Sequence, residues 1–196
     1  MDAKVKLNDI ETTTVYFAKP GKDNTEKTLA LARKRAEELG IRTVLVATTD
    51  GDTAAKAART FAGFQVVAVS HSHGFKKENA SGITAENRSA IESSGIALLT
   101  TTHAFGGVNR AIRSTLETYT PVEIVSHTLR RVLGDGIKVV CEIAVMAADA
   151  GLVRTDEDVV SIAGTGHGAD TAVVIKPANA HNFFDLRIKE LICKPR

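Results

Sequence analysis

The turn at residues 48–53, T-T-D-G-D-T, has the residue types of an anion-binding site. It follows the apolar, β-rich run V-L-V-A and precedes an alanine-rich amphipathic stretch, so it joins a predicted strand to a predicted helix. Backbone N–H groups at a helix N-terminus bind anions, threonine hydroxyls add donors, and a glycine lets a ligand approach closely. The candidate ligand-binding residues here are Thr48, Asp50, Gly51, Asp52 and Thr53. The alternative is an ordinary turn whose threonines and aspartates cap the helix.

A second glycine-rich loop, G-T-G-H-G-A-D at residues 164–170, follows a predicted strand near the end of the sequence. It contains G-x-G-x-G but precedes a strand rather than a helix, so its context does not fit a dinucleotide-binding loop. We expect either a lid over a ligand or a hairpin tip. Its candidate ligand-binding residues are Gly164, Gly166, Gly168, Asp170 and Thr171.

Three histidines stand near the ends of two predicted strands. His71 and His73 alternate, which would point both side chains the same way, and His103 follows the next strand. Isolated histidines are more often polar loop residues, and no Cys or Glu stands beside them. We therefore predict no metal site and keep these three only as weak candidates for one.

Residues 137–150 read I-K-V-V-C-E-I-A-V-M-A-A-D-A, which is almost uniformly apolar. This composition predicts a helix that is buried or faces another subunit. Lys138 lies four residues before Glu142, so we interpret the two as an ion pair on a narrow solvated face. A functional role for Asp149 is left open.

The elements that must position these residues follow an α/β pattern. A helix with the apolar stripe Leu29, Ala32, Ala36 and Leu39 is predicted to begin at Asn24 or Thr25 and end at Gly40. Alternation of strands and helices predicts a three-layer α/β/α fold with a mostly parallel sheet. The predicted strands are residues 14–18, 43–47, 66–70, 96–100, 158–163 and 171–176.

The last two predicted strands are separated only by the short glycine-rich loop, so they should form an antiparallel hairpin at one edge of the sheet. Residues 101–156 form an insertion that we expect to be helical after Gly107. Thr120-Pro121-Val122-Glu123 is a capping box with proline at the first helical position. The organisation predicted for residues 1–196 is one α/β domain with this helical insertion.

Bulk composition argues against several classes of partner. The 25 Lys and Arg residues are scattered and nearly balanced by 23 Asp and Glu, and there is no Trp, so we expect no nucleic-acid partner. Neither a signal peptide nor an apolar span of membrane length is evident, which predicts a cytoplasmic protein without a membrane partner. Cys141 lies in the apolar run and Cys193 in a predicted terminal helix, so two free thiols and a reducing compartment are expected.

Two stretches resemble the C-terminal domain of pyruvate kinases. That family has an alanine-rich helix, a strand, the turn T-x-S-G-x-[ST]-A, a helix, and a strand ending in A-V-[ST]. The corresponding residues here are T-L-A-L-A-R-K-R-A-E-E-L-G-I-R-T-V-L-V-A-T-T-D-G-D-T-A and V-V-A-V-S. The second stretch, A-A-D-A-G-L-V-R-T-D-E-D-V-V-S-I-A-G-T-G-H-G-A-D-T-A-V-V-I, resembles G-L-x-x-x-G-D-x-V-V-V followed by a glycine loop and an edge strand.

The resemblance is to stand-alone proteins with this domain, and it implies a ligand-binding fold without kinase activity. In the kinases the T-x-S-G-x-[ST] turn holds a phosphate of an allosteric sugar bisphosphate, and Thr48, Gly51 and Thr53 match it. Asp50 replaces the serine and Asp52 adds a second carboxylate, which should repel phosphate unless a cation compensates. This departure argues against the sugar bisphosphate as the ligand.

The resemblance also implies a five-strand sheet in which the strand at Thr43 lies beside the strand at Asp158, where the strand order switches and ligands bind. The first strand, Thr14 to Ala18, has no counterpart in the family pattern. If it inserts between those two strands, residues 19–25 enter the site and their lysines offset the aspartates. On that hypothesis Lys19, Gly21, Asn24 and Thr25 are further candidate ligand-binding residues.

We therefore predict a domain that binds a phosphate-bearing small molecule, a nucleotide or flavin mononucleotide (FMN), at the carboxyl ends of the strands. One alternative is an enzyme using the same cleft, with His71, His73, His103, Asp149 or Asp170 as acid, base or metal ligand. The other is a structural oligomerisation unit built on the helix at Ile137. A homo-oligomer is expected in either case.

Overall fold

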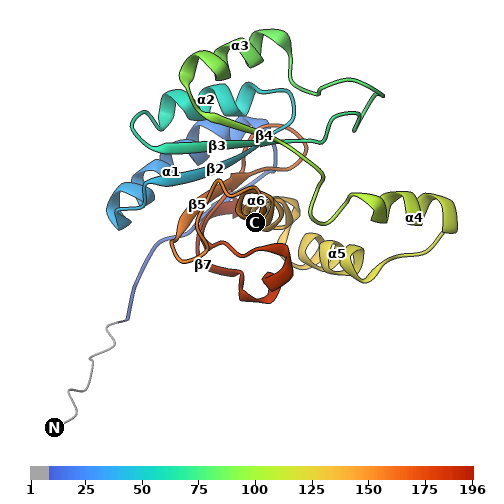
Figure 1. Cartoon of the computed structure of the whole chain (residues 1–196). Helices are drawn as coiled ribbons and strands as arrows, with labels where there is room; N and C mark the ends of the chain where they lie inside the picture. Colours follow the sequence, from blue (N-terminus) through green and yellow to red (C-terminus); the bar gives the residue numbers. More distant parts are fainter. Residues whose placement is uncertain (1–8) are drawn as a thin grey trace.

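Seven strands form one sheet in the computed structural model, which describes residues 9–196 (Figure 1). The strand order is β1-β7-β6-β5-β2-β3-β4. Strands β5, β2, β3 and β4 are parallel, β6 is antiparallel to both β5 and β7, and β1 is parallel to β7. The strands are β1 (Val15–Phe17), β2 (Thr43–Thr48), β3 (Gln65–Ser70), β4 (Ala97–Thr100), β5 (Val159–Ala163), β6 (Thr171–Lys176) and β7 (Arg187–Pro195).

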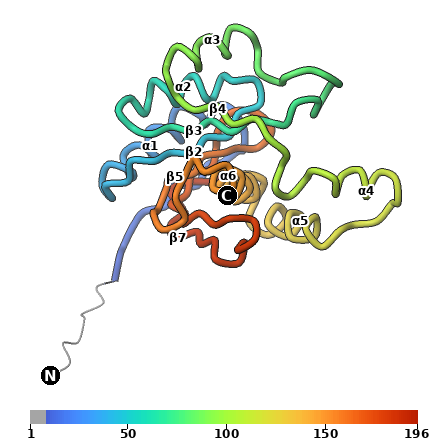
Figure 2. Tube along the Cα trace, in the orientation of Figure 1, coloured from blue at the N-terminus to red at the C-terminus, as the bar shows by residue number. Residues whose placement is uncertain are grey.

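Helices cover both faces of the sheet, so the predicted three-layer α/β/α fold is confirmed (Figures 1 and 2). One core lies under α1, α2 and α3, and the other lies under α6. Val44 and Val46 belong to the first core and Leu45 to the second, because successive strand residues face opposite sides. The helices are α1 (Thr25–Leu39), α2 (Asp52–Thr60), α3 (Ala85–Ser94), α4 (Val108–Leu116), α5 (Pro121–Leu133) and α6 (Asp135–Asp149), with short 3₁₀ helices η1 (Lys22–Asn24) and η2 (Ala180–Asp185).

Helix boundaries follow the sequence signals. Helix α1 ends at Gly40, which adopts the left-handed conformation predicted for a glycine cap and donates its N–H to the carbonyl of Ala36. Helix α5 begins with the predicted capping box, in which Thr120 and Glu123 each accept a hydrogen bond from the other's backbone N–H.

Three placements differ from the sequence analysis. Residues around Cys193 form strand β7 rather than a terminal helix, because pairing with β6 buries Ile192 and Cys193. The β5–β6 hairpin is antiparallel as predicted, but β7 and β1 extend the sheet beyond it, so the sheet has seven strands rather than the expected five. Strand β1 does not insert between β2 and β5, which pair directly as predicted; it lies at the far edge beside β7.

Helix α6 is the central helix of its layer and is buried by its own chain. Nearly every residue from Gly136 to Ala148 is buried against the sheet, α5 and η2. Ser161 of β5 donates its hydroxyl to the carbonyl of Val140 at 3.1 Å, which ties the helix to the sheet. The predicted burial of this helix is therefore confirmed without a second subunit.

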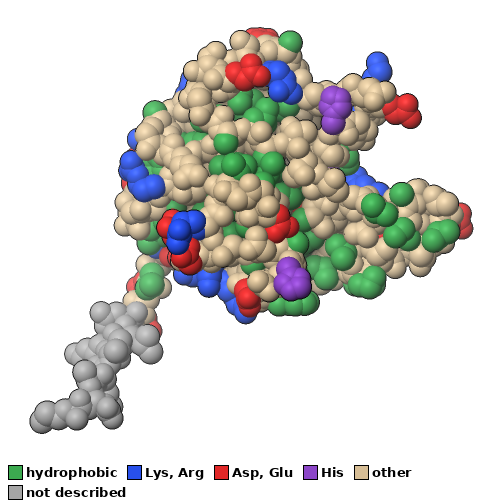
Figure 3. All heavy atoms as spheres, viewed as in Figure 1, with side chains coloured by type: hydrophobic (Ala, Val, Ile, Leu, Met, Phe, Trp, Pro, Cys, Tyr) green, Lys and Arg blue, Asp and Glu red, His purple; other side chains and the backbone are tan. Residues whose placement is uncertain are grey.

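The α4–α5 arm projects from one side of the sheet and exposes apolar side chains (Figures 1 and 3). Helix α4 has no buried residue, and its Val108 and Leu116 are 74% and 66% exposed. Cys141 and Cys193 are both buried free thiols, as predicted. Within residues 9–196, no helix combines the length and apolar character needed to cross a membrane.

The contact between α6 and β6 gives a prediction for Gly136→Ala. A Cβ at Gly136 would overlap the side chain of Thr171. Without that overlap, Gly→Ala within a helix stabilises a protein by about 1 kcal/mol. We expect destabilisation of about 1–3 kcal/mol instead, because overpacking forces a backbone shift. Urea unfolding measures the difference, and a variant at least as stable as the wild type would contradict the close contact.

Candidate functional site

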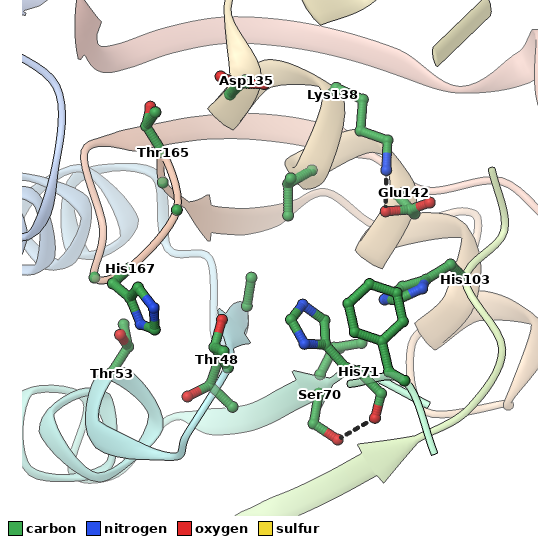
Figure 4. A pocket seen from close by; sticks show the side chains of 18 of the residues that line it. Thr48, Thr53, Ser70, His71, His103, Asp135, Lys138, Glu142, Thr165 and His167 are labelled. Carbon is green, nitrogen blue, oxygen red and sulfur yellow. Dashed lines mark hydrogen bonds and ion pairs between the residues drawn. The ribbon is translucent and has the colours of Figure 1, made fainter. Parts of the chain in front are cut away.

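A cavity of about 550 Å³ lies beyond the carboxyl ends of β2, β3 and β5 (Figure 4). Strands β2 and β5 are neighbours whose onward connections leave in opposite directions, which is the position where open α/β sheets bind ligands. The wall of the cavity is formed by the turn after β2, the segment after β3, the loop after β5 and helix α6. The lining residues include Thr48, Thr49, Asp50, Thr53, Ser70, His71, Phe75, His103, Arg110, Arg130, Asp135, Lys138, Glu142 and 164–168.

The turn after β2 is fixed by its own side chains. Thr48 Oγ1 accepts the Gly51 N–H at 3.1 Å, and Asp50 Oδ1 accepts the Asp52 N–H at 3.1 Å. The N–H groups of Thr53 and Ala54 lie in the first turn of α2, where a helix offers no internal acceptor. Thr48 and Thr53 line the cavity, so this end of it presents both hydroxyls and a helix N-terminus.

Gly51 does not line the cavity. Because glycine has no side chain, helix α3 can pack closely against this position. The φ of Gly51 is 100°, and a Cβ there would lie 2.6 Å from the Cβ of Asn87. Asn87 also donates from Nδ2 to the carbonyl of Asp50 at 3.1 Å. The expectation that Gly51 admits a ligand is thus replaced by a packing role, and the sequence analysis missed Asn87 because α3 is distant in the chain.

The two carboxylates of this turn have different surroundings. Asp52 pairs with Lys56 at 3.1 Å and does not line the cavity. Asp50 does line it, and its Oδ2 lies 3.9 Å from Nδ1 of His167 on the opposite loop. His167 and Asp50 therefore face each other across the cavity.

The loop after β5 is held from behind by Asp170, whose side chain is fully buried. Asp170 Oδ2 accepts the N–H groups of Gly21 at 2.8 Å and Thr165 at 3.2 Å. Its Oδ1 accepts the Thr171 hydroxyl at 2.9 Å. Asp170 and Thr171 therefore shape the loop, while Gly164, Gly166 and Gly168 line the cavity.

Residues 19–25 lie behind this loop and do not line the cavity, because β1 is at the far edge of the sheet. Thr25 Oγ1 accepts the Ala169 N–H at 3.0 Å, and Asn24 Nδ2 donates to the carbonyl of Lys19 at 2.8 Å. Together with Gly21, these residues support the loop from outside. The hypothesis that lysines of this segment enter the site is therefore wrong.

Three aromatic rings form the opposite end of the cavity. The ring centroids of His71 and Phe75 are 4.4 Å apart, and the His103 centroid lies 4.9 Å from Phe75 and 5.2 Å from His71. The Arg110 guanidinium stands 4.6 Å above Phe75. We call His71, Phe75 and His103 the aromatic cluster.

His73 does not join the aromatic cluster. Strand β3 ends at Ser70, so strand alternation does not carry on to His73, which is exposed and outside the cavity. Across residues 9–196, no three or more His, Cys, Asp or Glu side chains are arranged to hold a metal ion.

Both imidazoles of the aromatic cluster are neutral at neutral pH. Burial lowers the pKa of His71 from 6.5, and the positive charges of Lys76 and Arg110 lower it further. Burial lowers the pKa of His103 to about 4, against the opposing effect of Glu142. Each neutral ring offers one hydrogen-bond donor and one acceptor.

Lys138 and Glu142 form an ion pair in the wall above His103 (Figure 4). Only 4% and 5% of these side chains is exposed, so the predicted pair exists but its predicted solvated face is wrong. Burial lowers the pKa of Lys138, and Glu142 opposes that shift. Glu142 Oε1 also accepts the Phe105 N–H at 3.0 Å.

Two arginines of the helical insertion also reach the cavity. Arg110 of α4 and Arg130 of α5 line it, and Arg130 pairs with Asp135 at the start of α6. The sequence analysis missed both, since nothing in their local sequence shows which way α4 and α5 fold back.

A model of the pyruvate kinase alpha/beta domain matches residues 26–175, which is most of the chain. The chain belongs to the pyruvate kinase alpha/beta domain family. The match includes the turn after β2, the loop after β5 and α6, so every wall of the cavity lies within the family's domain. Strand β1, residues 19–25 and strand β7 lie outside it.

Asp149, which the sequence analysis left open, is not part of the cavity of this family member. Its Oδ1 accepts hydrogen bonds from Asn179 Nδ2 at 3.1 Å and from the Ala180 N–H at 3.0 Å. Asp149 therefore anchors the start of η2.

The environment of His103 predicts a loss of stability in acid. Between pH 6.5 and about 4 the unfolded chain takes up a proton at this residue and the folded chain does not, so stability falls as the pH falls. Urea unfolding across this window should show a steeper loss for the wild type than for His103→Gln. Parallel pH profiles would contradict the burial of a neutral His103.

Proposed function

We propose that the cavity binds a phosphate-bearing small molecule with a planar ring, either a nucleotide or FMN, and that it transfers no phosphate. The proposal rests on one observation: a single cavity has the N-terminus of α2 at one end and the aromatic cluster at the other. A ligand with a phosphate at one end and a ring at the other complements both ends.

At the phosphate end, two backbone N–H groups and two hydroxyls supply the donors. The N–H groups of Thr53 and Ala54 lack helical acceptors, and the Thr48 and Thr53 hydroxyls face the same space. His167 approaches from the loop after β5, on the side opposite α2 (Figure 4). This set supports an anion with several oxygens, such as phosphate.

At the ring end, the aromatic cluster provides π surface and Arg110 provides a cation above it. A sugar phosphate has no flat face to place there. The ring end therefore favours a nucleotide or FMN over a sugar phosphate.

The alternatives have less support. Among the acid, base and metal candidates, only His71 and His103 line the cavity, because His73, Asp149 and Asp170 do not. Helix α6 is buried by its own chain, so it no longer argues for a structural oligomerisation unit. A homo-oligomer and a cytoplasmic location remain predictions; the exposed apolar side chains of α4 and α5 are compatible with the former.

Replacement of Thr53 tests the phosphate end. The Thr53 hydroxyl would add a charge-assisted bond of about 1.5–3 kcal/mol, so Thr53→Ala should weaken FMN or AMP binding by roughly 10- to 100-fold. Isothermal titration calorimetry measures the change. Thr60→Ala at the other end of α2 is the matched control and should leave affinity unchanged. Equal affinities of all three proteins would place the phosphate elsewhere.

Replacement of Asp50 in the same titrations tests its charge. Asp50→Ser removes a carboxylate from the cavity and restores the serine of the family turn. We expect tighter phosphate binding, because the anion no longer faces a like charge. Weaker binding would show that Asp50 supports the site through its hydrogen bond to the Asp52 N–H.

A further inference from the structure

Phosphate and ring binding leave the buried Lys138–Glu142 pair unexplained. The residues around the pair on α6 are apolar from Ile137 to Ala148. Burial of two charges costs desolvation energy that their mutual attraction seldom exceeds, so apolar residues would hold the helix at least as well. Stability alone therefore gives no reason for this pair at the cavity wall.

The hydrogen bonds of the pair leave donors unused. The Lys138 ammonium has three N–H groups and donates one to Glu142 Oε2; the described residues provide it with no other hydrogen-bond partner. Each Glu142 oxygen already accepts one bond, from Lys138 or from the Phe105 N–H. Lys138 lines the cavity, so its two remaining N–H groups are available to an acceptor there.

Further donors and positive charge surround Lys138. Arg110 has no carboxylate partner within residues 9–196. The Asp135 carboxylate, which also lines the cavity, is already paired with Arg130. The Phe105 ring lies 5.6 Å from Lys138 Nζ and offers only its π face. Apart from one acceptor on each imidazole of the aromatic cluster, this wall therefore presents mainly hydrogen-bond donors.

We infer that Lys138 binds an oxo group on the ring of the ligand, so that the cavity selects oxo-bearing rings over amino-bearing ones. The inference rests on the proposed function, and Glu142 acts as a positioning residue for the ammonium. A carbonyl oxygen accepts the unused N–H groups, whereas an amino group at the same place leaves donors facing donors.

Inosine monophosphate (IMP) and AMP test this selection directly. They share phosphate, ribose and purine, but IMP has an oxo group at the position where AMP has an amino group. Calorimetric titration of the wild type should give roughly 10- to 100-fold tighter binding of IMP, as expected for a hydrogen bond to a charged donor.

The double variant Lys138→Met/Glu142→Gln removes both charges at similar side-chain size. It should bind IMP and AMP with nearly equal affinity, because its affinity for IMP falls to the level of its affinity for AMP. The matched control is Arg35→Met/Glu190→Gln, which removes the 2.7 Å ion pair between α1 and β7, outside the cavity. This control should keep the wild-type preference for IMP.

The outcomes separate the two proposals. If none of IMP, AMP and FMN binds the wild type, the proposed function fails and the inference fails with it. If FMN binds but neither nucleotide does, the proposed function stands and only the inference is overturned. If both bind equally, or if the double variant keeps the preference for IMP, only the inference is overturned. The wild-type comparison uses no variant, so it remains decisive even if the double variant does not fold.

Discussion

The close packing of α6 on the sheet is the constraint on which the site depends. Gly136 has no side chain where Thr171 of β6 approaches, and the Ser161 hydroxyl of β5 reaches the carbonyl of Val140. These contacts fix both the height and the rotation of the helix above the strands. Lys138 and Glu142 follow within two turns, so their side chains are carried to the strand ends and buried there.

The switch in strand order then brings distant segments to one cavity. Strand β2 leads into α2 on one face, whereas β5 follows α6 on the other. Their neighbouring carboxyl ends place the turn 48–53 opposite the loop 164–170, more than a hundred residues away in the chain. Asp170 holds the loop and Asn87 holds the turn, so hydrogen bonds within the chain fix both walls.

Local sequence was sufficient for much of the fold and for part of the site. The glycine cap at Gly40 and the capping box at Thr120 are local signals, and both are confirmed. Of the predicted stripe on α1, Leu29, Ala32 and Ala36 are buried, whereas Leu39 is 40% exposed at the end of the helix. The pairing of β2 with β5 followed from the family resemblance and is confirmed too. Strand β7 was mistaken for a helix because its state is decided by pairing with β6, which no local pattern records.

Side-chain environment was harder to predict than backbone state. The spacing of Lys138 and Glu142 predicts an ion pair in any helix, but only the packing of α6 against β2, β3 and Phe105 shows that it is buried. Likewise, Arg110 of α4 reaches Phe75 in the segment after β3, a contact that no local pattern predicts. Such contacts join residues that are remote in sequence, which explains why they were missed.

The charges of the cavity argue together for an anionic ligand. Two carboxylates on its wall are paired with cations, Asp135 with Arg130 and Glu142 with Lys138, whereas the carboxylate of Asp50 accepts the Asp52 N–H and still faces the cavity. Several donors on the wall have no such partner among the described residues. They are the first-turn N–H groups of α2, the Arg110 guanidinium and two N–H groups of Lys138. A ligand that brings acceptors to both ends would satisfy donors that folding alone leaves in place, whereas a cationic ligand would displace existing pairs.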